Sequence, residues 1–211
     1  FFFFFFYNDA FDWQGTQRLS IPYSDSIMYC LNVRSFTRHA SSKVKHKGTF
    51  AGMTEKLPYL KGLGINAVEL MPAYEFEECE WENMPDTAET HTIEYQVTHI
   101  DAKIDADSEP VRAKRINCWG YKEAFYFVPK ASFAAGDDAV TEFKHMVREF
   151  HKNGIEIIMQ FYFPEKTAVA EIPDILRFWV EEYHIDGFHL IGGDAPVVIL
   201  ATDPFLKDTK L

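Results

Sequence analysis

The sequence predicts an α/β protein in which a parallel β-sheet is covered by helices. Short, nearly continuous apolar segments that resemble buried strands alternate with segments that carry one apolar stripe at helical spacing. This alternation is typical of a parallel sheet, either open or closed into an α/β barrel, because helices cover both of its faces. The chain of 211 residues, 47% hydrophobic and 25% charged, is long enough to bury one sizeable core.

The first unit of this pattern occupies the first third of the chain. A strand-like run at residues 27–36 is followed by a turn region at residues 41–48. A helical stripe follows, with apolar residues three or four positions apart: Met53, Leu57, Leu60 and Leu63. Gly64 can end this helix in a left-handed conformation, and residues 67–72 form the second predicted strand.

Two further units repeat the order of helix and strand. The second has an apolar stripe from Val140 to Phe150, Gly154 as its stop, and a strongly apolar strand at residues 155–163. The third has a stripe from Ile172 to Tyr183 and a short strand at residues 187–191. The sequence therefore predicts four strands in total.

A long loop interrupts the pattern between residues 75 and 115. It contains an acidic run at residues 77–82 and a short alternation at Ile93, Tyr95 and Val97. Connections of this length are usually binding loops, lids or flexible insertions. The acidic run lacks the spaced ligands of a calcium loop, so a solvated surface is the simpler interpretation.

Composition and charge exclude several functions. The formal charge of −11, with no stripe of Lys or Arg, disfavours nucleic acids and anionic membrane surfaces as partners. Cys30, Cys79 and Cys118 are odd in number and have no metal-binding spacing, so we expect no zinc site and no disulfide framework. No segment is long enough to span a membrane, and no cofactor motif is present. A cytoplasmic location fits best. The opening run of six Phe has no functional explanation.

Four separated segments resemble the α-amylase superfamily of glycoside hydrolases, in its debranching branch of type I pullulanases and isoamylase-like enzymes. The stretch at residues 48–72 is the most specific and is similar to helix one and strand two of that family. Asn32 and Ser35 depart from it, standing where the family usually has His and Gly. The four segments lie at residues 11–37, 48–72, 117–132 and 143–188.

The resemblance implies a (β/α)₈ barrel of α-amylase type, of which this chain supplies about the first half, strands one to four. We divide the chain into an N-terminal lead-in at residues 1–20, compatible with the end of a preceding domain, and a partial barrel at residues 21–211 with an inserted loop at 78–115. The last residues resemble the lead-in to strand five, whose continuation carries the acid/base glutamate in the family. The rest of the barrel is expected from the same longer chain or from another copy, because a half barrel exposes sheet edges.

The resemblance places the family's catalytic positions on residues that have changed. Retaining glycosidases use one carboxylate as nucleophile and one carboxyl group as acid/base. The family motif Asp-Gly-Phe-Arg-Phe-Asp aligns from Asp186, which puts its nucleophile at Ile191 and its arginine at His189. The strand-three motif aligns its aspartate with Gln160. We expect little or no hydrolysis, because a hydrocarbon side chain cannot attack a sugar and loss of a nucleophile costs about 10⁴ to 10⁶ in turnover.

Other residues remain candidates. Asp194 and Glu165 are weak substitutes for the missing nucleophile; Asp194 lies roughly 10 Å further along an extended chain, unless Gly192 and Gly193 fold it back. Trp119 and Tyr121 are candidate sugar contacts, since the Tyr121 position resembles the family's stacking tyrosine; packing is the alternative. His189 is either a structural or a functional histidine of the strand-four mouth. Five other histidines show no ligand spacing and are expected on solvated surfaces: His91, His99, His145, His151 and His184.

Three functions stay open. The first, which we favour, is a catalytically inactive relative that binds α-glucan such as starch, glycogen or pullulan. The second is an active α-1,6-glucan debranching hydrolase that uses Asp194 or Glu165. The third is a structural module of a larger protein, favoured if Trp119 and Tyr121 are buried.

Overall fold

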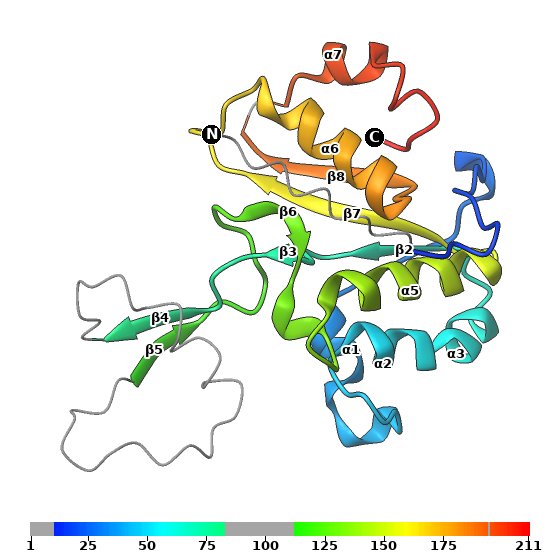
Figure 1. Ribbon diagram of the computed structural model, residues 1–211, viewed down its shortest axis with the longest axis vertical. Coiled ribbons are helices and arrows are strands. Elements are labelled where there is room, and N and C mark those ends of the chain that lie inside the picture. Colours follow the sequence, from blue (N-terminus) through cyan, green and yellow to red (C-terminus); the bar gives the residue numbers. More distant parts are fainter. Residues whose placement is uncertain (1–10, 83–111, 194) are drawn as a thin grey trace.

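A four-stranded parallel sheet forms the centre of the computed structural model, which describes residues 11–82, 112–193 and 195–211 (Figure 1). The strands follow the order β1, β2, β7, β8, so each new strand joins the same side of the sheet. This is the arrangement that the sequence predicts for the first half of a barrel. Their bounds are β1 (Met28–Leu31), β2 (Ala67–Leu70), β7 (Glu156–Phe163) and β8 (Gly187–Gly192).

Helices connect the strands and cover the sheet (Figure 1). The two longest, α5 and α6, bury aromatic residues against β7, including Phe143 and Trp179, whose rings meet edge to face at 5.5 Å. Trp179 also meets Phe161 of β7 at 5.7 Å, so helix and sheet share one aromatic core. The bounds are α1 (Val33–Arg38), α2 (Phe50–Glu55), α3 (Leu57–Gly62), α5 (Ala139–Lys152), α6 (Glu171–Tyr183) and α7 (Val197–Thr202), with single 3-10 turns at Tyr23–Asp25, Ala40–Ser42 and Ala131–Phe133.

The first predicted strand is too long. β1 ends at Leu31, and Asn32 begins a helix instead, because its side-chain oxygen accepts a hydrogen bond from Ser35 N at 3.0 Å. Asparagine is a favoured helix N-cap, and this local bond competes with continued extension of the strand. The apolar residues after Asn32 therefore belong to α1.

The first predicted helix is divided in two. α2 ends at Glu55 and α3 begins at Leu57, with Lys56 between them. Pro58 lies in the first turn of α3, where its missing N–H costs nothing, whereas inside one continuous helix it would remove a hydrogen bond. The predicted stop at Gly64 is confirmed, since its φ is +77°.

Part of the inserted loop is a β-hairpin. β4 (Cys79–Glu82) pairs antiparallel with β5 (Arg112–Ile116), and the pair projects from the body of the protein (Figure 1). A second antiparallel pair, β3 (Tyr74–Glu75) with β6 (Phe125–Pro129), lies at its base. The alternation at Ile93, Tyr95 and Val97 lies outside the described residues, as does the opening Phe run.

Two buried carboxylates, those of Asp186 and Glu156, lie at the amino-terminal ends of the strands and bind neighbouring segments of the chain. Asp186 accepts hydrogen bonds from Leu19 N, Ile157 N and His151 Nε2, each at 2.8 Å. Glu156 accepts from Ile21 N at 2.9 Å and from Lys210, so both chain ends are held here. The prediction that His151 lies on a solvated surface is wrong: it is 5% exposed. Its partner Asp186 is 35 residues away in the sequence, so a search for closely spaced residues does not find the pair.

The last residues return to the sheet. Lys210 forms an isolated parallel bridge with Gly187, at the start of β8. This position agrees with the prediction that residues 209–211 lead into a fifth strand. The division of the chain at residue 20 stays a prediction. Residues 11–19 contact the rest of the protein, for example at α5, where Arg148 Nη1 donates a hydrogen bond to Asp12 O at 2.7 Å.

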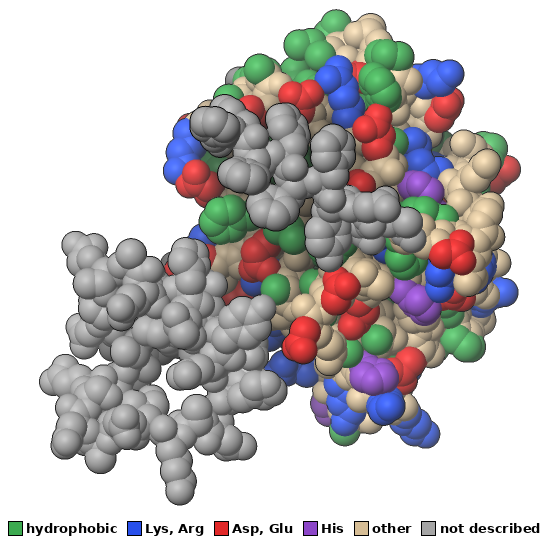
Figure 2. Space-filling view, in the orientation of Figure 1, with side chains coloured by type: hydrophobic (Ala, Val, Ile, Leu, Met, Phe, Trp, Pro, Cys, Tyr) green, Lys and Arg blue, Asp and Glu red, His purple; other side chains and the backbone are tan. Residues whose placement is uncertain are grey.

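The charged side chains on one face of the protein are of mixed sign. On the face shown in Figure 2, Lys and Arg side chains are interspersed with Asp and Glu and form no continuous stripe. Across the three described ranges, no helix is long and apolar enough to cross a membrane.

Candidate functional site

Polar side chains from all four strands meet on one face of the sheet. Successive strand residues point to opposite faces, so this face carries Cys30, Glu69, Gln160 and His189. Glu69 Oε1 accepts hydrogen bonds from Gln160 Nε2 and His189 Nδ1, both at 2.6 Å. Gln160 Nε2 also lies 3.5 Å from Cys30 Sγ. The structure thus brings together two predicted positions, Gln160 and His189, through a glutamate that the sequence analysis did not single out.

Tyr121 completes this polar layer from outside the sheet. Its hydroxyl donates a hydrogen bond to Gln160 Oε1 at 2.5 Å. Both the oxygen and the nitrogen of the Gln160 side-chain amide therefore form hydrogen bonds, and this amide links Tyr121 to Glu69. We call Cys30, Glu69, Tyr121, Gln160 and His189 the polar layer.

A tight turn presents Tyr121 and Trp119. Asn117 Oδ1 accepts from Trp119 N at 3.2 Å and from Gly120 N at 3.1 Å. Gly120 has φ +78°, and a Cβ there would lie 2.5 Å from the Phe76 ring, so only glycine fits this close approach. Trp119 is 50% exposed and Tyr121 37% exposed. Both rings are therefore partly accessible in the part of the barrel that this chain supplies, and their role as sugar contacts stays a prediction.

Two groups of the polar layer, the Tyr121 hydroxyl and the Cys30 thiol, have a raised pKa and therefore keep their protons at neutral pH. Burial, and then the nearby thiol of Cys30 and carboxylate of Glu69, raise the pKa of Tyr121 above its ordinary value. Burial and the Glu69 charge likewise raise the pKa of Cys30. Tyr121 is thus held as a neutral donor to Gln160, and Cys30 is a poor nucleophile at neutral pH because the reactive form is the thiolate.

His189 is exposed rather than buried. It is bonded to Glu69, but 57% of its side chain is open to solvent, compared with 13% for Glu69. In the part of the barrel described, the side chain of His189 is thus not buried, and whether its role is structural or functional stays a prediction. A solvent-facing imidazole that donates to a carboxylate can present its other nitrogen, Nε2, outward.

Ile191 lies two residues after His189 on β8, nearer the carboxyl end of the strand and on the same face of the sheet. In the parallel pairing its neighbour on β7 is Tyr162, just as Gln160 is the neighbour of His189. Ile191 is partly buried, and the Tyr162 ring lies 6.2 Å from that of Tyr121. Ile191 and Tyr162, neither of which carries a carboxylate, therefore pair next to Gln160 and His189, on the side of the carboxyl ends of the strands.

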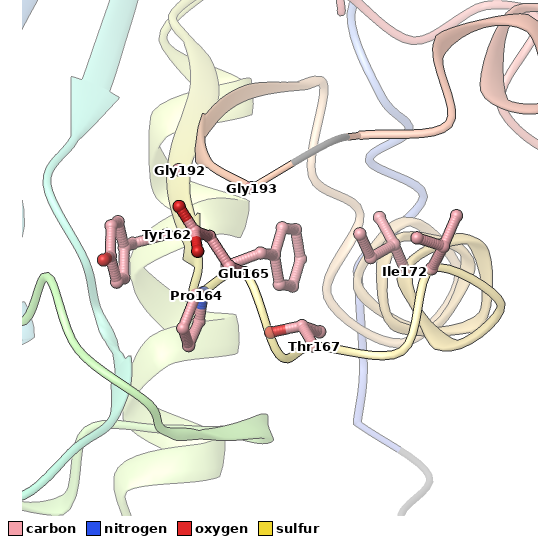
Figure 3. Close-up of a pocket in the computed structure, with 9 residues that line it drawn as sticks. Tyr162, Pro164, Glu165, Thr167, Ile172, Gly192 and Gly193 are labelled. Carbon is pink, nitrogen blue, oxygen red and sulfur yellow. The ribbon is translucent and has the colours of Figure 1, made fainter.

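Glu165 follows β7 and lines a pocket of about 540 Å³ together with Gly192 and Gly193 at the end of β8 (Figure 3). It is exposed, and its Cα would lie 3.2 Å from a Cβ at Gly193. Asp194, the other candidate substitute, lies outside the described residues. Among the described residues, no group of three His, Cys, Asp or Glu side chains is arranged to hold a metal ion.

Comparison with known families identifies the fold. The sequence model of the family described as "Alpha amylase, catalytic domain" matches residues 31–164, which begin at the last residue of β1 and include β2, β7 and the turn that presents Tyr121. The match covers more than half of the chain.

The chain belongs to the alpha-amylase catalytic-domain family.

Curated relatives of this alpha-amylase domain include isoamylases and glycogen debranching enzymes. Isoamylase 1, chloroplastic, from Oryza sativa subsp. japonica is 32% identical over 229 residues, which cover 85% of this chain and 25% of that protein. The Glycogen operon protein GlgX homolog of Haemophilus influenzae is 24% identical, covering 97% of this chain and 36% of its own length. The chain thus resembles the debranching branch and spans about a quarter of the isoamylase it matches.

Solved structures agree on the alpha-amylase fold. A pullulanase from Paenibacillus barengoltzii, in a complex with maltotriose, superposes with a TM-score of 0.59 at 22% sequence identity. The superposition covers 85% of this chain and 33% of that pullulanase. β1, β2, β7 and β8 are therefore part of an alpha-amylase barrel, and the chain covers only part of it.

Proposed function

We propose that this chain belongs to an α-glucan-binding protein of the debranching branch that does not hydrolyse its ligand. The observation that carries the proposal is the pairing of Ile191 with Tyr162 above the polar layer. Alignment with the debranching motif puts the nucleophile at Ile191, on the face of β8 that carries His189. A hydrocarbon side chain has no electron pair with which to attack an anomeric carbon.

The groups around Ile191 do not replace the nucleophile. Retaining hydrolysis needs two carboxyl groups about 5 to 5.5 Å apart on either side of the scissile bond. Glu69 pairs in register with Ile158 and, through it, with Gly187, four residues before Ile191 on β8. Its Oε1 accepts the two hydrogen bonds from Gln160 and His189. Positioning errors of about 1 Å already reduce turnover strongly, so a carboxylate displaced in this way is a poor substitute.

Exposed aromatic rings support the binding half of the proposal. Trp119 and Tyr121 present flat surfaces next to the polar layer. Aromatic rings combine a large apolar face with a polar edge, as suits a sugar ring that has C–H faces and hydroxyl rims. The pullulanase that shares this fold was solved with maltotriose, an α-glucan fragment. This exposure also argues against a purely structural module.

A debranching hydrolase remains the second candidate, because Glu165 lies beside the end of β8 where the nucleophile is missing. Its Cα approaches Gly193, and its side chain is exposed. It belongs to the loop after β7, whereas the family's nucleophile is on strand four. The cytoplasmic location stays a prediction, since the isoamylase named above is a chloroplastic protein of a plant.

Affinity electrophoresis of the complete protein in gels that contain glycogen tests the binding. We expect glycogen to retard the wild type and Tyr121→Ala to migrate faster in the glycogen gel than the wild type does. Tyr59→Ala is the matched control, because Tyr59 is also exposed but lies on α3 and stacks with Lys56. Equal mobility of the wild type with and without glycogen would overturn the proposal. If Tyr121→Ala and Tyr59→Ala are retarded equally, Tyr121 is not a glycogen contact.

A further inference from the structure

A local group of positive charges lies in the segment that joins α1 to α2, in a chain whose formal charge is −11. Residues 38–47, which we call the basic loop, contain four basic residues, two histidines and no acidic residue. In Figure 2, Lys, Arg and His side chains gather at the lower end of the coloured surface, where Figure 1 shows this loop. All four basic side chains are exposed: Arg38, Lys43, Lys45 and Lys47.

The backbone of the basic loop is fixed against the body of the protein. Val44, in its middle, is only 7% exposed. Glu55 of α2 accepts hydrogen bonds from Lys45 N at 2.7 Å and from His46 N at 3.1 Å. The His46 carbonyl lies so close to α2 that a Cβ at Gly52 would be 2.1 Å from its oxygen. The lysine side chains therefore project from an ordered backbone, which reduces the entropy lost when a ligand binds.

The charged ends of the four basic side chains have no carboxylate partner in the described part of the chain. Glu55, which contacts the loop, bonds to its backbone and to His46 Nδ1 at 2.8 Å rather than to a lysine. Elsewhere on the surface, exposed lysines such as Lys122 and Lys166 pair with glutamates. The basic loop is thus a positive surface that its own neighbours do not neutralise.

Lys43 has a backbone conformation that favours glycine. Its φ is +58° and its ψ is 17°, in the left-handed region, at the end of the 3-10 turn Ala40–Ser42. A residue with a Cβ adopts this conformation only at a cost in free energy. The exposed side chain of Lys43 does not pack in the core, so packing does not compensate for that cost. A residue kept in an unfavourable conformation indicates a role for its side chain, here a positive charge.

The properties of the basic loop restrict its partner. A broad anionic surface, such as a membrane or a nucleic-acid duplex, also faces the acidic remainder of the chain and is repelled by it. Residues 38–47 include no aromatic side chain on which bases could stack and no exposed large aliphatic one to anchor lipid. Lysines act as point charges without the planar fork that recognises phosphate. A narrow chain of carboxylates fits these properties best.

We propose that the basic loop is a docking surface for an acidic, flexible segment of a partner protein, rich in Asp and Glu. The carboxylates of such a segment supply the partners that the four basic side chains lack. Each pair is exposed, so the attraction is weak per pair and decreases with salt. This inference does not rest on glucan binding, because no residue of the polar layer takes part in it.

Fluorescence anisotropy of a labelled peptide of about ten glutamates, titrated with the complete protein, tests the surface. We expect binding at about 50 mM salt that weakens at about 300 mM, where charges are screened more strongly. Lys45→Gln/Lys47→Gln should raise the Kd about fivefold, through the loss of two exposed pairs. Lys166→Gln/Lys207→Gln is the matched control, because it removes the same charge from two other exposed lysines. It should change the Kd by less than about twofold.

Lys43→Gly separates binding from folding. It removes the ammonium group and also relieves the left-handed conformation. We expect the Kd for the peptide to rise about twofold, while the urea midpoint is no lower than that of the wild type. Unchanged peptide binding by this variant would show that Lys43 is not part of the docking surface.

The remaining outcomes decide the inference independently of the proposed function. If the complete protein does not bind the peptide at low salt, or if the two double variants weaken binding equally, the inference is wrong. If oligouridylate or phosphatidylserine vesicles bind the loop more tightly than the peptide does, the partner is not an acidic protein segment. Retardation of Lys45→Gln/Lys47→Gln by glycogen should equal that of the wild type. A loss of this retardation would make the basic loop part of a glucan site and overturn its assignment to a protein partner.

Discussion

Glu69 and His189 form a short hydrogen bond across the polar layer, 2.6 Å between Oε1 and Nδ1. Since the two residues lie on β2 and β8, with β7 between them, this bond spans three strands of the sheet. Gln160 of β7 donates to the same oxygen. Glu69 is therefore the centre of the polar layer, although it does not belong to the motifs that carry the family's chemistry.

Glu69→Ala should destabilise the protein, because it leaves Gln160 Nε2 and His189 Nδ1 without their acceptor. Hydrogen bonds to a charged group contribute about 1.5 to 3 kcal/mol each at most, so we expect a loss of about 2 kcal/mol in the free energy of unfolding. Urea denaturation of the complete protein measures it. Glu77→Ala is the control, since Glu77 forms an exposed pair with Lys122 and should change stability by less than about 1 kcal/mol. Equal effects of the two substitutions would mean that the polar layer is not a stabilising unit.

Gly192→Ala should be much more damaging than Gly64→Ala. Both glycines have positive φ, +99° and +77°, but a Cβ at Gly192 would meet Phe163 O at 2.3 Å, whereas none of the described atoms lies within 4 Å of one at Gly64. We expect a loss of about 1 kcal/mol at Gly64 from backbone strain alone, and about 3 kcal/mol at Gly192 from strain plus overlap. Thermal denaturation of the two variants compares them directly. Similar losses would show that the close contact of the β8 exit with the β7 loop does not exist.

His184 should make stability fall as the pH decreases below about 6.5. Burial, and then the positive charges of His151 and Arg18, lower the pKa of His184 from its ordinary 6.5, although Asp186 and Glu182 oppose this effect. The folded protein therefore prefers the neutral imidazole, and the unfolded chain takes up the proton first as the pH falls. Stability is fully present above pH 6.5 and is lost as the pH falls through that value towards the lower folded pKa.

Urea midpoints at about pH 7.5 and 5.5 measure this dependence. His184→Asn is the informative variant, because His184 has φ +55° and asparagine tolerates that conformation. It loses the ring that stacks on Trp13 at 3.8 Å, so it should be less stable at both values. The difference between the two midpoints should nevertheless be smaller than in the wild type. An unchanged difference would assign the pH dependence to other groups.

The sequence predicted the sheet well where strands are continuously apolar. β2, β7 and β8 lie where apolar runs place them, because buried parallel strands need such side chains on both faces. It failed at residues 32–36, where the Asn32 cap ends the predicted strand early, and at His151, whose partner is distant in the chain. Long-range polar pairs leave no local pattern.

The site was partly predictable for the same reason. Motif alignment located Gln160, His189, Ile191 and Tyr121, and the structure places them on or next to one face. Glu69 was missed, yet a charged residue inside the apolar strand Ala67–Leu70 is a signal that could have found it. The pocket depends on the approach of two loops, and only the pair Gly192 and Gly193 hints at it in the sequence.

Reducing-end release from pullulan and glycogen by the complete protein tests the central claim most directly, namely that Ile191 leaves the site without a nucleophile. Wild type, Asp194→Asn and Glu165→Gln should be compared at high protein concentration and long incubation. We predict no release above the buffer blank from any of the three. Release by the wild type that either substitution abolishes would contradict the claim and would identify the residue that has taken the place of the nucleophile.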